Sequence, residues 1–268
     1  MRSRMVTAVV PALLAALLLT ACGPRAEQTP APAETTAPAE TTAPAETTAP
    51  AETAAVPMLP GLDAAALNST MPEEDYAAFE AYLPVLEGER TFRWVAGPYD
   101  GYPDYDWEPF DADMAEVRDR FWDGFEIDQP PETLTLDRLA VQDVDGDGTM
   151  ELAMLFQDGA YQYLVLHMED EDCYGTSFGV RWFEGLQTNG VYWGSGGAGS
   201  STYYRMAFRD GIFQQQELGS REEWGTGSEY TLAGETVTKE TFDAWRAENL
   251  PGEVTWYAPD GSVIPENQ

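Results

Sequence analysis

The chain has 268 residues, a formal net charge of -33 and an aromatic content of 12%. So large an acidic excess, with Lys239 as the only lysine, argues against nucleic acid as a partner because phosphates would be repelled. All Trp, Tyr and Phe residues lie beyond Val56, so a folded core is expected only after that point.

Residues 1–21 have the form of a signal peptide. Arg2 and Arg4 precede an apolar run, which ends at Cys22. Residues 19–22, LTAC, resemble the lipobox of bacterial lipoproteins. That resemblance implies that Cys22 is diacylated, becomes the mature N-terminus and anchors the chain to a membrane on its extracellular side. A secretory signal cleaved nearby, with Cys22 left as a free thiol, is the alternative.

Residues 22–57 are expected to form a disordered linker. The hexapeptide PAETTA recurs in tandem at residues 32–37, 38–43 and 44–49. A repeat without large apolar side chains cannot bury enough surface to offset the entropy of ordering. An O-glycosylated stalk is a minor alternative. Residues 58–268 are then expected to form one globular domain, with no internal disulfide because Cys173 is its only cysteine.

Two N-terminal helices are predicted by apolar spacing and by capping boxes. The first is expected from Thr70, with Glu73 at capping-box spacing, to Gly88, with Pro84 kinking or ending it. Its apolar stripe comprises Tyr76, Phe79, Leu83 and Leu86. The second is expected to start at Asp113, with Glu116 completing the box. Its stripe comprises Met114, Val117, Phe121 and Phe125.

From Leu134 the apolar period becomes two, with a one-residue slip between Leu136 and Leu139. A strand, a hairpin turning at Asp158-Gly159, and further strand-like pieces follow, with a clear turn at Asp210-Gly211. These pieces read FGVRWFEGL, GVYWGSG, STYYRMAF and GIFQQQEL. A last helix is expected from about Lys239, with Phe242 and Trp245 facing inward. The predicted fold class is therefore α+β: an antiparallel β-meander with flanking N-terminal helices and a C-terminal helix.

The stretch DVDGDGTMEL is typical of a calcium-binding loop. Carboxylates at alternate residues of a tight turn converge on one centre, and glycines between them let the backbone turn. The ligand positions one, three, five, seven and nine fall on Asp143, Asp145, Asp147, the Thr149 carbonyl and Glu151. One Ca²⁺ ion is the expected cofactor, and Mg²⁺, which demands a tighter octahedron, is the weaker candidate. The alternative is an exposed acidic turn without an ion.

The loop differs from an EF-hand, because position twelve is Met154 and the flanking segments are predicted strands. It resembles instead the shorter loops of the FG-GAP and VCBS repeat families, D-x-[DN]-G-D-G-x-x-[DE]-L, at seven positions. The matching residues are Asp143, Asp145, Gly146, Asp147, Gly148, Glu151 and Leu152. Those families repeat the loop around a propeller, whereas this chain carries it once, so the resemblance does not extend to a propeller.

A wider resemblance covers most of the folded part. A Y-x-x-F helix, a strand, DVDGDGTMEL, GSGGA, LGSREEW and AGETVTKETFDAW follow one another as in surface lipoproteins of gut Firmicutes that bear one such loop. The resemblance implies location and calcium binding, but no activity.

Catalytic arrangements find little support in the sequence. His167 is the sole histidine and lies in a strand-like run, and none of Ser195, Ser200 and Ser201 fits G-x-S-x-G. Cys173 is near His167, but four neighbouring acids at residues 169–172 would raise the pKa of its thiol rather than lower it. The chain is therefore expected not to be an enzyme. A secreted hydrolase with paired carboxylates ranks third among the functions considered, after the two described next.

Two aromatic loops suggest a second possible function, that of a surface receptor for a glycan or a cell-surface protein. One loop carries Tyr99, Tyr102, Tyr105 and Trp107, and the other carries Trp193, Tyr203 and Tyr204. For the first loop the alternative is packing of its aromatics on the domain, and for the second it is a flexible turn between two strands. The first choice is a lipid-anchored, extracytoplasmic, non-catalytic domain in which one calcium ion has a structural role.

Overall fold

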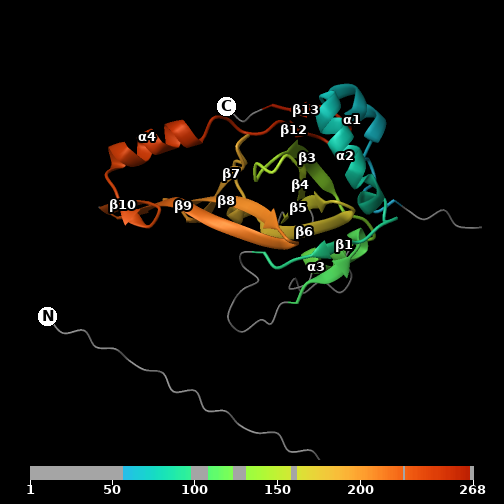
Figure 1. Cartoon of the computed structure of the whole chain (residues 1–268), viewed down its shortest axis with the longest axis horizontal. Helices are drawn as coiled ribbons and strands as arrows, with labels where there is room; N and C mark the ends of the chain where they lie inside the picture. The colour runs from blue at the N-terminus through green and yellow to red at the C-terminus, as the bar shows by residue number, and fades with distance from the viewer. Residues whose placement is uncertain (1–56, 98–107, 123–130, 158–161, 226, 266–268) are drawn as a thin grey trace, which may run out of the picture. The chain divides into compact units, whose positions relative to one another are not determined.

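The computed structural model describes residues 57–97, 108–122, 131–157, 162–225 and 227–265. The chain divides into the units Met1–Glu52 and Thr53–Gln268, and all described residues belong to the second. Its helices are α1 (Ala64–Thr70), α2 (Glu73–Leu86), α3 (Met114–Trp122), the 3-10 helix η1 (Val180–Trp182) and α4 (Lys239–Asn249). Together with two antiparallel-rich sheets they make an α+β fold, as the sequence predicts (Figure 1).

The larger sheet has the strand order β13-β12-β3-β4-β5-β6-β1-β2. Its centre is an antiparallel meander, and β1 joins β6 in parallel. The bounds are β1 (Phe92–Trp94), β2 (Phe110–Ala112), β3 (Leu136–Gln142), β4 (Glu151–Phe156), β5 (Gln162–Glu169), β6 (Asp172–Gly179), β12 (Trp256–Tyr257) and β13 (Val263–Ile264). Both β4 and β5 are apolar over most of their length because this sheet is covered on both faces.

The smaller sheet is a five-stranded antiparallel meander in the order β11-β10-β9-β8-β7. Its strands are β7 (Val191–Gly197), β8 (Ser200–Arg209), β9 (Ile212–Trp224), β10 (Gly227–Leu232) and β11 (Glu235–Thr236). The β8–β9 hairpin turns at Asp210 and Gly211, which both have positive φ, 52° and 68°. That is the backbone of the type I′ turn that Asp-Gly predicts.

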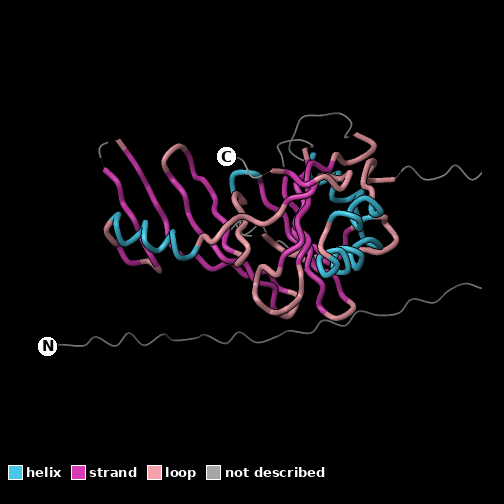
Figure 2. The backbone as a smooth tube through the Cα atoms, turned by 90° about the horizontal axis from the view of Figure 1, so that it is seen from above, coloured by secondary structure: helices cyan, strands magenta, loops and turns pink. Residues whose placement is uncertain are grey.

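Three hydrophobic clusters hold these layers together. The first lies between the larger sheet and the helices α1, α2 and α3, and includes Phe79, Leu152 and Leu166. The second lies between the other face of that sheet and strands β7, β8 and β9 of the smaller sheet, and includes Val165 and Phe208. The third lies under α4, where Phe242 is fully buried. Figure 2 shows α1 and α2 on one side of the larger sheet and α4 running along the smaller one.

The three predicted helices are confirmed as α2, α3 and α4, and only α2 differs from the prediction in its start and part of its stripe. Phe125 of the α3 stripe lies outside the described residues. Asp113 caps α3 as predicted, since its Oδ1 accepts from Ala115 N and Glu116 N, and Glu116 Oε2 accepts from Asp113 N. Thr70 does not cap α2, however: it is the last residue of the unpredicted helix α1, and α2 follows Pro72. The buried residues of α2 are Phe79, Tyr82, Val85 and Leu86. Phe79 and Leu86 of the predicted stripe are thus confirmed, whereas Tyr76 and Leu83 are only partly buried.

Among the strands, the predicted slip is confirmed as a register shift between Leu136 and Arg138 in β3. The piece FGVRWFEGL is wrong as a strand, because β6 ends at Gly179 and residues 180–182 form η1. The sequence also predicts one meander where there are two sheets. The missed pairs β1–β2 and β12–β13 are two or three residues long and join the larger sheet from distant parts of the chain.

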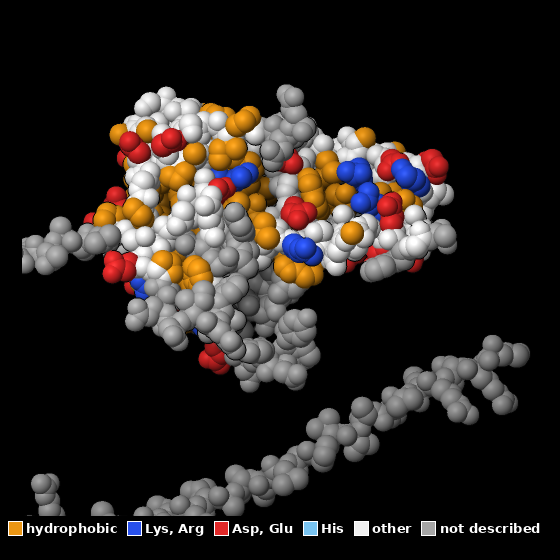
Figure 3. All heavy atoms as spheres, turned by 180° about the vertical axis from the view of Figure 1, so that it is seen from behind, with side chains coloured by type: hydrophobic (Ala, Val, Ile, Leu, Met, Phe, Trp, Pro, Cys, Tyr) orange, Lys and Arg blue, Asp and Glu red, His pale blue; other side chains and the backbone are white. Residues whose placement is uncertain are grey.

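Basic side chains lie beside acidic ones on the face of the domain drawn in Figure 3. Arg221 Nε is 3.9 Å from Glu223 Oε1, and Lys239 Nζ is 2.5 Å from Asp243 Oδ2.

Within the ranges that the structure describes, no helix is long and apolar enough to cross a membrane.

Candidate metal centre

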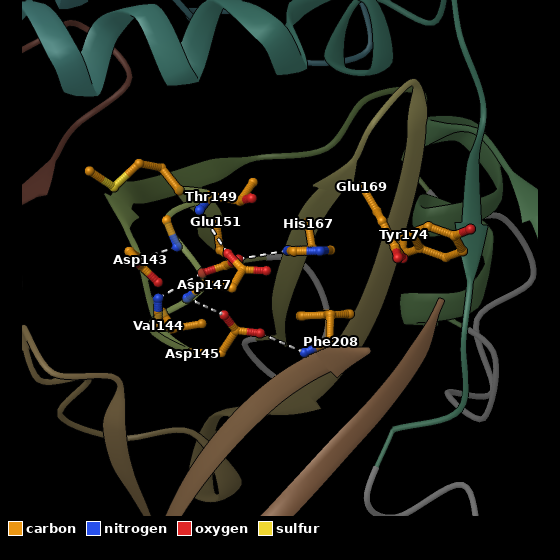
Figure 4. A network of polar contacts seen from close by, with 12 residues as sticks. Asp143, Val144, Asp145, Asp147, Thr149, Glu151, His167, Glu169, Tyr174 and Phe208 are labelled. Carbon is orange, nitrogen blue, oxygen red and sulfur yellow. Dashed lines mark hydrogen bonds and ion pairs between the residues drawn. The ribbon is translucent and has the colours of Figure 1, made fainter. Parts of the chain in front are cut away.

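Three aspartates converge in the turn that joins β3 to β4. One carboxylate oxygen from each of Asp143, Asp145 and Asp147 lies within 4.8 Å of the other two. Alternate side chains of the turn thus point to one centre, as the sequence predicts (Figure 4). Oxygen ligands at such a spacing suit a hard divalent cation. The group could therefore hold a metal ion.

The backbone of the turn wraps around these carboxylates. Asp143 accepts from Gly146 N at 2.6 Å and from Gly148 N at 3.1 Å, one bond on each oxygen. The two glycines have φ of 76° and 93°, in the region that other residues adopt only with strain. Asp147 Oδ1 accepts from Thr149 N at 2.7 Å. Local hydrogen bonds and glycine conformations therefore fix the aim of the carboxylates.

Asp145 connects the turn to the smaller sheet. Its side chain is fully buried, and its Oδ2 accepts from Phe208 N at 3.0 Å and from Arg209 Nη1 at 2.5 Å. Its Oδ1 accepts from Asp147 N at 3.1 Å. One carboxylate thus contacts both the turn between β3 and β4 and strand β8, and this contact joins the two sheets.

Glu151, predicted as the ninth-position ligand, is not in the group of three. Only 1% of the residue is exposed. Its Oε2 accepts from Val144 N at 2.7 Å, and its Oε1 lies 2.7 Å from His167 Nδ1. Because both oxygens are occupied beneath the turn, Glu151 holds the loop to β5. Its assignment as a ninth-position ligand stays a prediction.

The Glu151–His167 pair is buried on both sides, and His167 stacks on Phe208 with ring centroids 4.9 Å apart. Burial raises the pKa of Glu151 to about 7, against the opposing hydrogen bonds from His167 and Val144. Burial alone would lower the pKa of His167, but the hydrogen bond and negative charge of Glu151, with Asp147 and Asp145, raise it. The pair therefore retains a proton to higher pH than the two groups do when free.

The ends of the turn are held by packing. Tyr82 of α2 donates its hydroxyl to the carbonyl of Met150 at 2.7 Å, just where β4 begins. On the other side, a Cβ added to Gly190 would lie 1.7 Å from the carbonyl oxygen of Val144. The backbone of residue 190 therefore touches the loop directly. Thr149, the predicted seventh-position ligand, is half-buried within the turn.

The Cys173–His167 pairing weighed as a nucleophile and base is not formed. Cys173 faces the helices in the first hydrophobic cluster, whereas His167 faces the smaller sheet and stacks on Phe208. The two side chains thus lie on opposite faces of the larger sheet. Burial raises the pKa of the Cys173 thiol to about 12, which keeps it protonated.

The second aromatic loop packs on the domain instead of forming a surface. Tyr203 is buried beneath α4, with ring centroids 6.0 Å from Trp193 and 5.5 Å from Trp245. Tyr204 packs against Tyr192 in the second cluster. The first aromatic loop, with Tyr99, Tyr102, Tyr105 and Trp107, lies outside the described residues, as does Cys22.

Three contacts of the site were missed by the sequence reasoning. The predicted turn gave no signal for the partnership of His167 with Glu151. A two-residue turn at Asp158-Gly159, which lies outside the described residues, would set residue 151 opposite 166. The observed register pairs Leu152 with Leu166 and so brings residues 151 and 167 opposite each other. The contacts of Phe208 N and Arg209 with Asp145 had no signal in the sequence either. Both residues are more than 60 residues from Asp145 in the chain and belong to another sheet. A comparison with protein-family models, curated proteins and solved structures found no match.

Proposed function

We propose that the chain is a lipid-anchored, extracytoplasmic, non-catalytic domain stabilised by one Ca²⁺ ion at the turn between β3 and β4. The observation that carries the proposal is the convergence of Asp143, Asp145 and Asp147, with carboxylate oxygens within 4.8 Å of one another. Like charges this close are costly unless a cation offsets them. In this proposal the three aspartates and the Thr149 carbonyl hold the ion, and Glu151 anchors the loop from beneath.

Calcium fits this turn better than magnesium. Ca²⁺ accepts six to eight oxygens in flexible geometry, whereas Mg²⁺ requires a near-ideal octahedron and keeps several waters. The aspartate oxygens of this turn already accept backbone hydrogen bonds in fixed directions, so they cannot rearrange freely around a smaller ion. A flexible coordination sphere is therefore favoured.

The anchor and the location rest on the sequence. A signal-like segment ending at Cys22 and a repeat-rich stretch precede the described domain. Calcium is abundant outside cells, and extracellular modules bind it with Kd of about 0.1–1 mM. A weak structural site and an extracytoplasmic position therefore agree with each other.

Thermal melts in chelator and in Ca²⁺ test the proposal. At about 10 mM Ca²⁺ and the Kd above, binding to the native state adds about 1.4–2.7 kcal/mol, or about 3–10 °C in Tm for a domain of this size. Asp147→Asn is the informative variant, because it keeps an acceptor for Thr149 N and removes one charge from the group. We expect it to lose most of the calcium-dependent shift.

Asp170→Asn is the matched control. Asp170 is exposed, lies outside the group of three and has φ of 55°, a conformation that asparagine adopts readily. Its calcium-dependent shift should equal that of the unmodified chain. Identical melts of the unmodified chain in chelator and in Ca²⁺ would reject the proposal.

A further inference from the structure

Arg209 places its guanidinium against two of the three clustered aspartates. Its Nη1 is 2.5 Å from Asp145 Oδ2 and 3.6 Å from Asp147 Oδ2, and it also donates to the carbonyl of Phe208 at 2.7 Å. Asp145 is fully buried, whereas 44% of the Arg209 side chain is exposed. The positively charged guanidinium of Arg209, the last residue of β8, therefore lies at the edge of the aspartate group.

An ion at this centre and Arg209 would share the carboxylates of Asp145 and Asp147. Calcium ligands lie at about 2.3–2.6 Å from the ion, so an ion held by Asp145 and Asp147 is within a few ångströms of the guanidinium. At that separation two positive centres repel each other strongly, and burial of Asp145 weakens the screening by water.

We propose that Arg209 is the residue that sets the calcium affinity, by competing with the ion for Asp145 and Asp147. The inference rests on the proposed function and adds a regulatory element to it. In this arrangement Arg209 partly neutralises the aspartates when no ion is bound, and binding has to weaken its ion pairs. The affinity is thereby held below the value that three unopposed carboxylates would give.

The surroundings of Arg209 allow such a displacement. A hollow of about 340 Å³ lies beside its side chain, lined also by Asp147, Thr149 and His167. Arg209 lies at the end of β8, next to the Asp210-Gly211 turn. Its side chain can therefore turn toward solvent without disturbing the hydrogen bonds between β8 and β9. The hydrogen bond from Phe208 N keeps Asp145 in place meanwhile.

Calorimetric titration with CaCl₂ on the full chain tests the inference, using the unmodified chain and three variants. Arg209→Gln removes the competing charge, and we expect it to bind Ca²⁺ about tenfold more tightly. Arg209→Lys keeps the charge and should stay within about threefold of the unmodified chain.

Arg205→Gln is the matched control, because it removes the same charge from the same strand, four residues and roughly 13 Å away. Its Kd should stay within about twofold of the unmodified chain, which separates a local effect from a change in net charge.

Equal or weaker binding by Arg209→Gln, with normal binding by the unmodified chain, overturns the role of Arg209 and leaves the calcium site standing. An absence of binding heat in every sample rejects the calcium site itself and this inference with it. A second measurement needs no variant to fold: the guanidinium NMR signals of Arg209 in the unmodified chain should shift with the same midpoint as calcium binding. Signals that stay fixed through saturation would also overturn the inference.

Discussion

His167 Nδ1 lies 2.7 Å from Glu151 Oε1, and this pair joins β5 to the first residue of β4 directly beneath the aspartate turn. Both side chains are buried, at 2% and 0% exposure. The stability of the loop is therefore linked to the protonation of two groups that no solvent screens.

The pair makes stability depend on pH in one direction. Both folded-state pKa values are raised, that of Glu151 to about 7, so the native state binds more protons than the unfolded state from about pH 4.5 up through these raised pKa values. Its contribution is fully present at low pH and is lost as the pH rises through the folded pKa values. We expect a loss of about 1–2 kcal/mol in free energy of unfolding from pH 5 to pH 8.

Urea denaturation in chelator at several pH values measures this loss, with the double variant Glu151→Gln/His167→Gln as the reference. Self-repulsion among the many surface carboxylates affects both proteins alike, so the difference between them isolates the pair. A difference that is constant from pH 5 to pH 8 would refute the linkage.

Gly190→Ala should destabilise the domain by more than its backbone conformation alone requires. Its φ is 74°, and the new Cβ would lie 1.7 Å from the carbonyl oxygen of Val144. Gly88 also has φ of 74° but has nothing within 4 Å of an added Cβ, so Gly88→Ala reports the cost of the conformation, about 1–2 kcal/mol. We expect Gly190→Ala to cost at least about 2 kcal/mol more in denaturant unfolding. Equal costs would show that residue 190 does not press on the loop.

Cys173 should be inert to thiol reagents while the domain is folded. It is 4% exposed and burial raises its pKa to about 12, so little thiolate forms at pH 8. In a Cys22→Ser variant, where Cys173 is the only thiol, alkylation should be slow in buffer and fast in denaturant. Reaction in buffer at the rate of a free thiol would contradict the burial of this side chain.

Local sequence signals predicted the elements whose partners are near in the chain. Asp113 and Glu116 cap α3, Asp210 and Gly211 close the β8–β9 hairpin, and the slip before Leu139 marks the register shift in β3. Each depends on contacts within a few residues, where spacing and turn chemistry decide the structure.

Long-range contacts account for the misses. The three-residue strand β1 pairs with β6 across some 80 residues, and no local period marks so short a strand. Thr70 has the spacing of a cap, but Pro72 and the end of α1 determine where α2 begins. Within the site, the turn was predicted from its own residues, whereas the contacts of Arg209 with Asp145 and Asp147 depend on the packing of one sheet on the other.

The hydrogen bond from Phe208 N to Asp145 spans 63 residues, and this separation bears on the order in which contacts form during folding. A contact of that sequence separation forms only after a long loop has closed, later than the neighbouring strands β3, β4 and β5 pair. The three aspartates would thus reach their final arrangement near the end of folding. Under the calcium proposal made above, the ion would act chiefly by slowing unfolding and would contribute little to the speed of folding.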